Sequence, residues 1–250
     1  MILRTLAILL LTAPTLLAAD KPAEKPAEKP EPNVIKGRVV DAAGQPVAGA
    51  VVNADHTLLY NANTQARTAK DGTYRIKVPN GAYRVTAKLT RDVGETRYAF
   101  DLHPETPDDV NGEEGAIRDF TWRLSGRRPA PSEGHYGALV VAYNDPGDFS
   151  VLWSDVELTL TPEGKLIDGS EGKPVVGKLV ATGDGFAVRD VPVGTYRITA
   201  RSAPKGQAAT PLLVRVRNTG EFAASVTSPI LAPHGGNLAI HKLEIEYKKP

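Results

Sequence analysis

The residues best suited to metal or acid–base chemistry are the five histidines of the chain, which are His56, His103, His135, His234 and His241. They form no His-Glu-x-x-His motif, and no two are three or four positions apart, the spacing that places two ligands on one face of a helix. The chain also has no cysteine, which excludes thiolate ligands, a thiol nucleophile and disulfides. The sequence therefore predicts no metal site and no cofactor.

Motifs for nucleophilic or phosphate chemistry are also missing. Ser170 lies in a Gly-Ser-Glu-Gly turn and lacks the strand-to-helix setting of a nucleophile elbow. There is no phosphate-binding loop and no dinucleotide fingerprint. The segment 144–148 offers oxygen atoms but not the twelve-residue calcium pattern. We expect a protein that is not an enzyme. The least favoured alternative is a hydrolase whose carboxylates or histidines come together only in the fold.

Aromatic side chains give the best argument for ligand binding. Sugar rings stack their C–H faces on flat aromatic rings, and polar neighbours fix the orientation. The candidates are Trp122, Tyr143, Phe149 and Trp153. Each could instead be a core residue, because aromatic side chains bury so much area. Trp122 in particular alternates with polar neighbours, as a core position in a strand would.

The charge balance argues against some partners. The chain has 250 residues, with 30 Lys and Arg against 29 Asp and Glu. Binding to nucleic acid needs a basic face that displaces counterions. A near-neutral chain therefore predicts no nucleic-acid partner.

The first residues are typical of an export signal. Arg4 precedes an apolar run, and Leu17-Ala18-Ala19 ends it with small residues before Asp20. The run is too short to cross a bilayer. Repeats of Lys-Pro-Ala-Glu follow, and proline keeps such a spacer extended. We expect an exported protein, periplasmic or extracellular, with no membrane span after the signal is cleaved.

From residue 34 onward the pattern is that of short strands. Apolar and polar residues alternate at 73–78 and again at 83–87, with Pro79-Asn80-Gly81 between them, which predicts a hairpin. An acidic loop is expected at 101–114. No part of the mature chain has sustained helical periodicity, so the fold class is all-β.

One piece of the chain is repeated. Residues 71–87 align with 184–200 without a gap and are identical at nine of seventeen positions. Phe186 and Val188 are nevertheless one residue out of phase with Tyr74 and Ile76. A bulge near Asp190 would restore the phase. The second half is therefore interpreted as a diverged relative of the first.

The order of motifs in the first half resembles the carboxypeptidase regulatory-like domain. The residues that carry the resemblance are the opening strand pair at 35–52, Thr68, Asp71-Gly72, Tyr74, Pro79-Asn80-Gly81, Tyr83 and Val85. The resemblance covers 34–89 and implies a prealbumin-like β-sandwich, a fold also used by starch-binding modules and bacterial surface proteins. It implies no peptidase activity, because the zinc site of carboxypeptidases lies in a separate catalytic domain.

These observations predict two tandem prealbumin-like (Ig-like) β-sandwich domains. The expected segments are a signal peptide at 1–19, a linker at 20–33, the regulatory-like sandwich at 34–126, a linker at 127–134 and a second, diverged sandwich at 135–250. The predicted function is adhesion, assembly or protein interaction at the cell envelope. The alternative is a carbohydrate-binding protein of the starch-binding-like type. The partner is accordingly expected to be an envelope protein or polysaccharide.

Overall fold

The computed structural model describes residues 29–232 and 240–250. The predicted signal peptide, most of the predicted spacer and His234 lie outside these residues. Within the described chain, all regular structure is β apart from one 3-10 turn, η1, at Trp153–Asp155. None of the described helical residues forms a segment long and apolar enough to cross a membrane. The predicted all-β class is confirmed.

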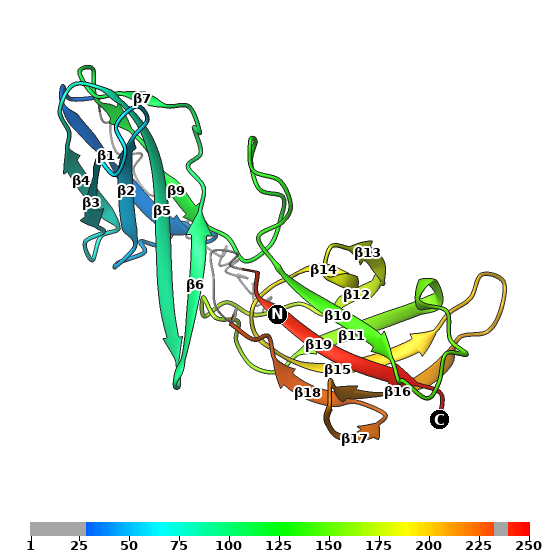
Figure 1. The fold of residues 1–250 in the computed structure, drawn as a ribbon. Coiled ribbons are helices and arrows are strands. Elements are labelled where there is room, and N and C mark those ends of the chain that lie inside the picture. The colour runs from blue at the N-terminus through cyan, green and yellow to red at the C-terminus, as the bar shows by residue number, and fades with distance from the viewer. Residues whose placement is uncertain (1–28, 233–239) are drawn as a thin grey trace, which may run out of the picture.

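The strands from 34 to 122 form two facing sheets, which we call the N-terminal sandwich (Figure 1). One sheet contains β1 (Val34–Asp41), β4 (Thr73–Lys77), β8 (Ala116–Ile117) and β9 (Phe120–Trp122). The other contains β2 (Val51–His56), β3 (Asn63–Arg67), β5 (Ala82–Val93), β6 (Thr96–Leu102) and β7 (Val110–Asn111).

Alternation places the apolar side chains of both sheets between them. On β4, Tyr74 and Ile76 are buried while Arg75 is not, and on β5 every second residue from Tyr83 to Leu89 is buried. Successive side chains of a strand point to opposite faces, so a period of two gives each sheet one apolar face. Burial of these faces against each other is the main stabilising term, at about 25 cal/mol per Å².

The predicted hairpin at 73–87 is wrong. β4 pairs with β1 in one sheet, whereas β5 pairs with β2 and β6 in the other. The turn at Pro79–Gly81 therefore arches from sheet to sheet. A hairpin within one sheet and an arch between two sheets bury the same alternating residues. The period of two in the sequence therefore does not distinguish a hairpin from an arch.

The strands from 138 to 248 form the C-terminal sandwich, which shares no strand pair with the N-terminal one in the described chain. Its strands are β10 (Ala138–Asn144), β11 (Val156–Pro162), β12 (Val175–Lys178), β13 (Val180–Thr182), β14 (Gly185–Val191), β15 (Thr195–Ser202), β16 (Thr210–Val216), β17 (Thr219–Ala223), β18 (Val226–Pro229) and β19 (Lys242–Lys248). This separation supports the predicted division into two domains, whose boundaries stay predictions.

Strand β16 of the C-terminal sandwich passes from one sheet to the other. The strand order runs β12-β11-β15-β16-β19-β10-β14-β13. β16 pairs with β15 through its first half and with β19 through its second. β12 and β13 stand at opposite ends of the order, yet only the buried Leu179 separates them along the chain. The two sheets are thus joined at both sides, which limits the edge open to other strands.

The bulge predicted near Asp190 is confirmed. The pairing of β10 with β14 shifts between Ala138, which faces Val191, and Val140, which faces Val188. Asp190 has a φ of 62°, the left-handed conformation frequent in bulges. Val188 is buried as Ile76 is, but Phe186 is 36% exposed, in contrast to the buried Tyr74 with which it aligns.

Candidate functional site

The two sandwiches meet through β6. The hydroxyl of Tyr98 donates a hydrogen bond to the carbonyl of Ile230 at 2.9 Å. The rings of Tyr98 and Phe100 stack on the imidazole of His241, with centroids 5.8 and 4.7 Å away. All three rings are buried. The long hairpin of β5 and β6 therefore anchors the N-terminal sandwich to the segment that leads into β19.

Asp190 fixes the chain that links the two sandwiches. Its carboxylate accepts hydrogen bonds from the backbone N–H of Gly126, at 2.9 and 3.0 Å, and from that of Gly137, at 3.0 Å. The bulge in β14 aims the side chain toward the linker. A Cβ at Gly137 would lie 2.4 Å from the carbonyl carbon of Asp190, so this close approach requires glycine.

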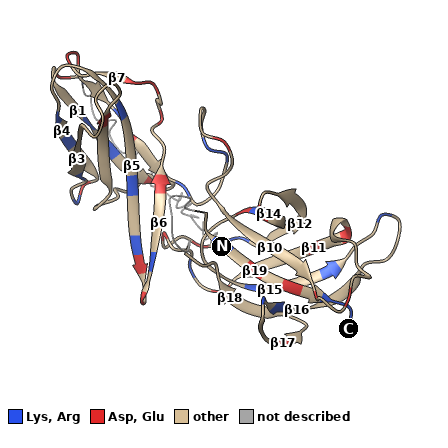
Figure 2. Ribbon diagram, viewed as in Figure 1, with Lys and Arg blue, Asp and Glu red and all other residues tan. Residues whose placement is uncertain are grey.

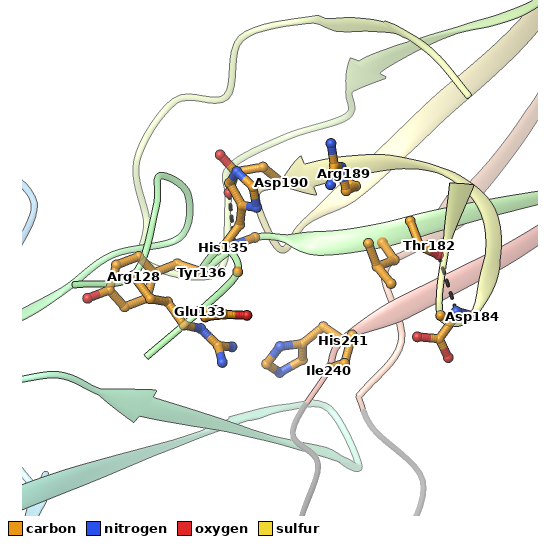
Figure 3. A pocket seen from close by; sticks show the side chains of 14 residues that line it. Arg128, Glu133, His135, Tyr136, Thr182, Asp184, Arg189, Asp190, Ile240 and His241 are labelled. Atoms are coloured by element: carbon orange, nitrogen blue, oxygen red, sulfur yellow. Dashed lines mark hydrogen bonds between the residues drawn. The ribbon is translucent and has the colours of Figure 1, made fainter. Parts of the chain in front are cut away.

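A pocket of about 430 Å³ opens beside this linker (Figure 3). The linker contributes Arg128, the segment between the linker and β10 contributes Tyr136, β14 contributes Arg189, and the approach to β19 contributes Ile240 and His241. Figure 3 shows the guanidinium of Arg128 beside the imidazole of His241. The pocket thus combines apolar walls with two arginines, and we call it the junction pocket.

His241 is held neutral in this pocket. Its side chain is only 4% exposed, and its Nε2 has no hydrogen-bond partner. Burial, and then the nearby charge of Arg128, lowers the pKa of His241 to about 4. His103 lines a neighbouring hollow of about 450 Å³ on the other side of Tyr136, and burial and Arg128 lower its pKa as well.

Three acids line the junction pocket, and two of them, Asp184 and Asp190, have partners, while Glu133 is exposed. Asp190 accepts the linker N–H groups, and Asp184 forms an ion pair with Lys242 at 3.6 Å. Among the described residues, no carboxylate lies within ion-pair distance of Arg128 or Arg189. The pocket lining therefore combines two arginines, three carboxylates and apolar side chains.

Trp122 lies in the core of the N-terminal sandwich. It is 4% exposed, its ring contacts that of Phe100 at 5.3 Å, and the guanidinium of Arg91 covers it at 5.1 Å. Its role in ligand binding stays a prediction, and the alternative assignment of Trp122 to the core is confirmed. The reason is that β9 completes the sheet and turns this side chain inward.

Trp153 lies at the surface of the C-terminal sandwich. Its ring stacks on that of Phe186 at 4.0 Å with an angle of 11° between the planes. Trp153 is half-buried and Phe186 is 36% exposed, while Phe149, in the loop before η1, is 76% exposed. The structure pairs Trp153 with Phe186, which the sequence interpretation had aligned with Tyr74. Among the ring contacts of the described residues, none joins Phe149 to this pair.

Tyr143 belongs to a network of charges on β10, β16 and β19. Its hydroxyl donates to Oε1 of Glu244 at 3.3 Å, and the guanidinium of Arg217 lies 4.0 Å from the ring centre. Arg217 also donates to Oε2 of Glu244 at 3.1 Å. One ring face of Tyr143 is thus covered, and its role in ligand binding stays a prediction.

The sequence interpretation missed the loop between β2 and β3. Leu58, Leu59 and Tyr60 are 83%, 59% and 101% exposed. The sequence did contain a signal for an exposed loop. Three large apolar residues stand in a row before Asn61, and the alternation of apolar and polar residues stops there. We call residues 57–62 the apolar loop.

A scan against family models matches residues 34–111 to the carboxypeptidase regulatory-like domain. No curated protein matches the chain. Solved structures that share similarity include the Bacillus anthracis TIE protein, with 15% identity over 86% of this chain and 34% of that one and a TM-score of 0.33. A streptococcal ancillary pilin has 14% identity over 86% and 62% of the two chains, with a TM-score of 0.26.

A third similar structure is a B repeat unit of the collagen-binding surface protein of Staphylococcus aureus, with 12% identity over 88% and 100% of the two chains and a TM-score of 0.24. This chain covers about a third of the Bacillus anthracis protein and less than two thirds of the streptococcal pilin. The family match and the motif order agree with the two facing sheets of the N-terminal sandwich. The predicted resemblance to the carboxypeptidase regulatory-like domain is therefore confirmed, and the residues matched are 34–111.

Proposed function

We propose that this chain is an exported, non-catalytic β-sandwich protein that acts in adhesion, assembly or protein interaction at the cell envelope, in the periplasm or outside the cell. The observation that carries the proposal is the apolar loop. Scattered apolar residues are normal on a protein surface, but three large ones in sequence at the end of a sandwich are typical of an interaction site.

The backbone of the apolar loop is held in place. Nδ1 of His56 accepts the backbone N–H groups of Leu58 and Leu59, at 3.1 and 3.2 Å. The N–H of Thr57 donates to the carbonyl of Ala82 at 2.9 Å, and the N–H of His56 donates to that of Ala62 at 2.8 Å. A partner would therefore meet a surface that is already ordered, which reduces the entropy lost on binding.

The apolar loop also lies where a partner can reach it. His56 pairs with Tyr83 at the start of β5, while the far end of β5 leads into the hairpin that contacts the C-terminal sandwich. The loop thus occupies the end of the N-terminal sandwich remote from the junction (Figure 1). Full burial of one leucine side chain contributes about 1.5–3 kcal/mol, so three such residues can dominate an interface.

Binding to envelope material tests this function. The chain from residue 20 to 250 and a variant carrying Leu58→Ser, Leu59→Ser and Tyr60→Ser would be compared for retention on envelope fractions of the source cells. We expect retention of the unaltered chain and loss in the variant, with Val176→Ser as a control, because Val176 is 58% exposed on another surface. Equal retention of all three proteins would refute the role of the loop.

A second candidate function is carbohydrate binding, and the stacked pair of Trp153 and Phe186 favours it. The partly exposed ring of Phe186, stacked on the half-buried ring of Trp153, offers a flat surface on which a sugar ring could stack. A glycan array probed with the chain and with Trp153→Ala tests this candidate. Binding that Trp153→Ala abolishes, and that Tyr60→Ser leaves unchanged, would support it.

A further inference from the structure

The contact between the two sandwiches is built around one histidine. His241 lies on the C-terminal side of the contact, and its imidazole stacks on the rings of Tyr98 and Phe100 from β6. Phe100 in turn contacts Trp122, in the core of the N-terminal sandwich, with ring centres 5.3 Å apart. The hydrogen bond from Tyr98 to Ile230 lies beside these rings. Since no strand pair joins the two sandwiches in the described chain, this group of rings is central to holding them together.

His241 fits this contact as a neutral ring. A neutral imidazole has one nitrogen that carries no hydrogen, whereas both nitrogens of the protonated ring are donors. Nε2 of His241 is buried and has no hydrogen-bond partner, so protonation would place a charged N–H group where no acceptor meets it. The faces of the two aromatic rings attract a cation, but burial opposes the charge more strongly and lowers the pKa of His241 to about 4.

A second histidine and an arginine make the same region sensitive to acid. His103 directly follows β6, its ring contacts that of Tyr136 with centres 5.4 Å apart, and its buried Nδ1 has no hydrogen-bond partner. The guanidinium of Arg128 is near both histidines and disfavours the charged form of each. Acid would therefore bring two further positive charges close to Arg128, and each charge makes the others more costly.

The nearby acids offset this charge only in part. Asp101 favours the protonated form of both histidines, but it also forms an ion pair with Lys88 at 3.6 Å, among the opposite charges that lie along β5 and β6 (Figure 2). Glu133 in the linker is exposed, and solvent weakens its attraction. The other titratable or charged side chains around His241 are His135, Tyr136, Asp184, Arg189, Asp190 and Lys242. Those around His103 are Glu105, Arg123 and Arg127.

We propose that acid opens this contact: protonation of His241 and His103 releases β6 from the approach to β19, and the two sandwiches separate while each stays folded. Each sandwich buries the apolar faces of its own strands, whereas the rings around His241 come from both. The linker stays with the C-terminal sandwich, because Asp190 holds its N–H groups independently of the histidines. The N-terminal sandwich would therefore move relative to the linker and the C-terminal sandwich together.

Acid favours the separated form because that form binds protons at a higher pH. Once water reaches His241, its pKa returns to the ordinary value near 6.5, while in the closed form it is about 4. The closed contact is thus fully favoured above pH about 6.5 and is weakened as the pH falls toward about 4. From His241 alone, the ratio of separated to closed molecules should rise at least about tenfold between pH about 7 and pH about 5.

Distances between two spin labels test the inference. The chain has no cysteine, so Thr64→Cys and Ala224→Cys place one label at an exposed position of each sandwich. Double electron–electron resonance on the chain from residue 20 to 250 would be recorded at a series of pH values from about 7.5 to about 5, a range in which most carboxylates stay ionised. We expect one narrow distance distribution at the upper end. A longer and broader one should grow as the pH falls and disappear when neutral pH is restored, while the far-UV circular dichroism spectrum stays the same.

Three labelled variants separate the histidines from other effects of acid. His241→Phe keeps a ring beside Tyr98 and Phe100 that cannot be protonated, so it should stay closed at pH about 5. His135→Gln removes a histidine that lines the same pocket but is only partly buried, and this control should open as the unaltered chain does. Arg128→Gln removes the positive charge near both histidines and should therefore need a lower pH to open. If circular dichroism shows that His241→Phe does not fold, Arg128→Gln provides the test.

Three results would overturn the inference. The first is a distance distribution that does not change over the whole pH range. The second is opening at the same pH in His241→Phe or, where that variant does not fold, in Arg128→Gln. The third is a longer distance that appears only together with loss of the circular dichroism spectrum, because the chain would then unfold as a whole. None of these results bears on the proposed function, since binding through the apolar loop is measured at neutral pH with the contact closed.

Discussion

His56 and Gly81 fit against each other so closely that position 81 has no room for a side chain. A Cβ built at Gly81 would lie 2.4 Å from Nε2 of His56, and Gly81 has a φ of 152°. The imidazole also makes an edge contact with the ring of Tyr83, whose centre lies 5.1 Å from that of the imidazole. Held in this way, His56 presents Nδ1 to the backbone of the apolar loop.

Gly81→Ala is therefore expected to loosen the apolar loop. The new methyl group would displace the imidazole and remove the acceptor of the N–H groups of Leu58 and Leu59. We expect a loss of about 1–3 kcal/mol in the free energy of unfolding. Faster amide hydrogen exchange at residues 58 and 59 should accompany it. Gly94→Ala, at a turn glycine with open space around it, is the control for the general effect of replacing a glycine.

Asp190 is expected to control the order of the linker. Asp190→Ala would leave the N–H groups of Gly126 and Gly137 without their acceptor and place alanine at a φ of 62°. We expect the free energy of unfolding to fall by about 1–3 kcal/mol. Small-angle X-ray scattering should show a larger radius of gyration, because the linker would hold the two sandwiches less firmly. Asp190→Asn keeps a carbonyl oxygen and tolerates the left-handed conformation, so it should retain most of the stability. Equal effects of both substitutions would contradict this role.

The junction should lose stability in acid. Because burial lowers the pKa of His241 to about 4 from an ordinary value near 6.5, the unfolded chain binds a proton at a higher pH than the folded chain does. The stability that neutral His241 contributes is complete above pH about 6.5 and is lost as the pH falls toward about 4. The charged groups that act on His241 are Arg128, which favours the neutral form, and Asp101, which opposes it.

Urea unfolding at a series of pH values between 7 and 4 checks this expectation. In His241→Phe the aromatic contacts with Tyr98 and Phe100 can be kept, but the titrating group is gone. The variant should show a shallower dependence of stability on pH than the unaltered chain. His103, whose pKa is lowered by the same causes, should account for part of the remaining slope. An unchanged slope in the variant would exclude His241 as its source.

The two tryptophans should differ in their contribution to stability. Trp122→Ala would open a cavity in the core and cost about 3–5 kcal/mol. Trp153 is half-buried and stacks on the partly exposed Phe186, so Trp153→Ala should cost clearly less. Chemical denaturation monitored by far-UV circular dichroism measures both. Similar losses would show that the pair of Trp153 and Phe186 is a structural element and not a surface platform.

Much of the fold could be predicted because alternation reports which face of a strand is buried. The inward positions Tyr74, Ile76, Tyr83 and Val85 follow from the period alone. Which strands pair does not follow from it. An arch and a hairpin bury the same residues, so the partner of β4 depends on contacts with β1, about 40 positions away in the sequence.

The candidate sites were harder to predict for a related reason. The junction pocket depends on side chains from the linker, β14 and the approach to β19, which only the tertiary structure brings together. Phe186 has the sequence pattern of a core residue, but the bulge at Asp190 changes the phase of β14. The apolar loop was visible as Leu58-Leu59-Tyr60, yet apolar residues in a row fit a buried strand equally well.

Photocrosslinking at position 60 tests the role of the apolar loop most directly. The chain would carry benzoylphenylalanine in place of Tyr60 and be expressed in the source cells. A second chain would carry it in place of Phe149, which is also strongly exposed. We predict a discrete crosslinked protein from position 60, absent from position 149 and abolished by Leu58→Ser with Leu59→Ser. No crosslink at position 60, or the same products from both positions, would contradict the account.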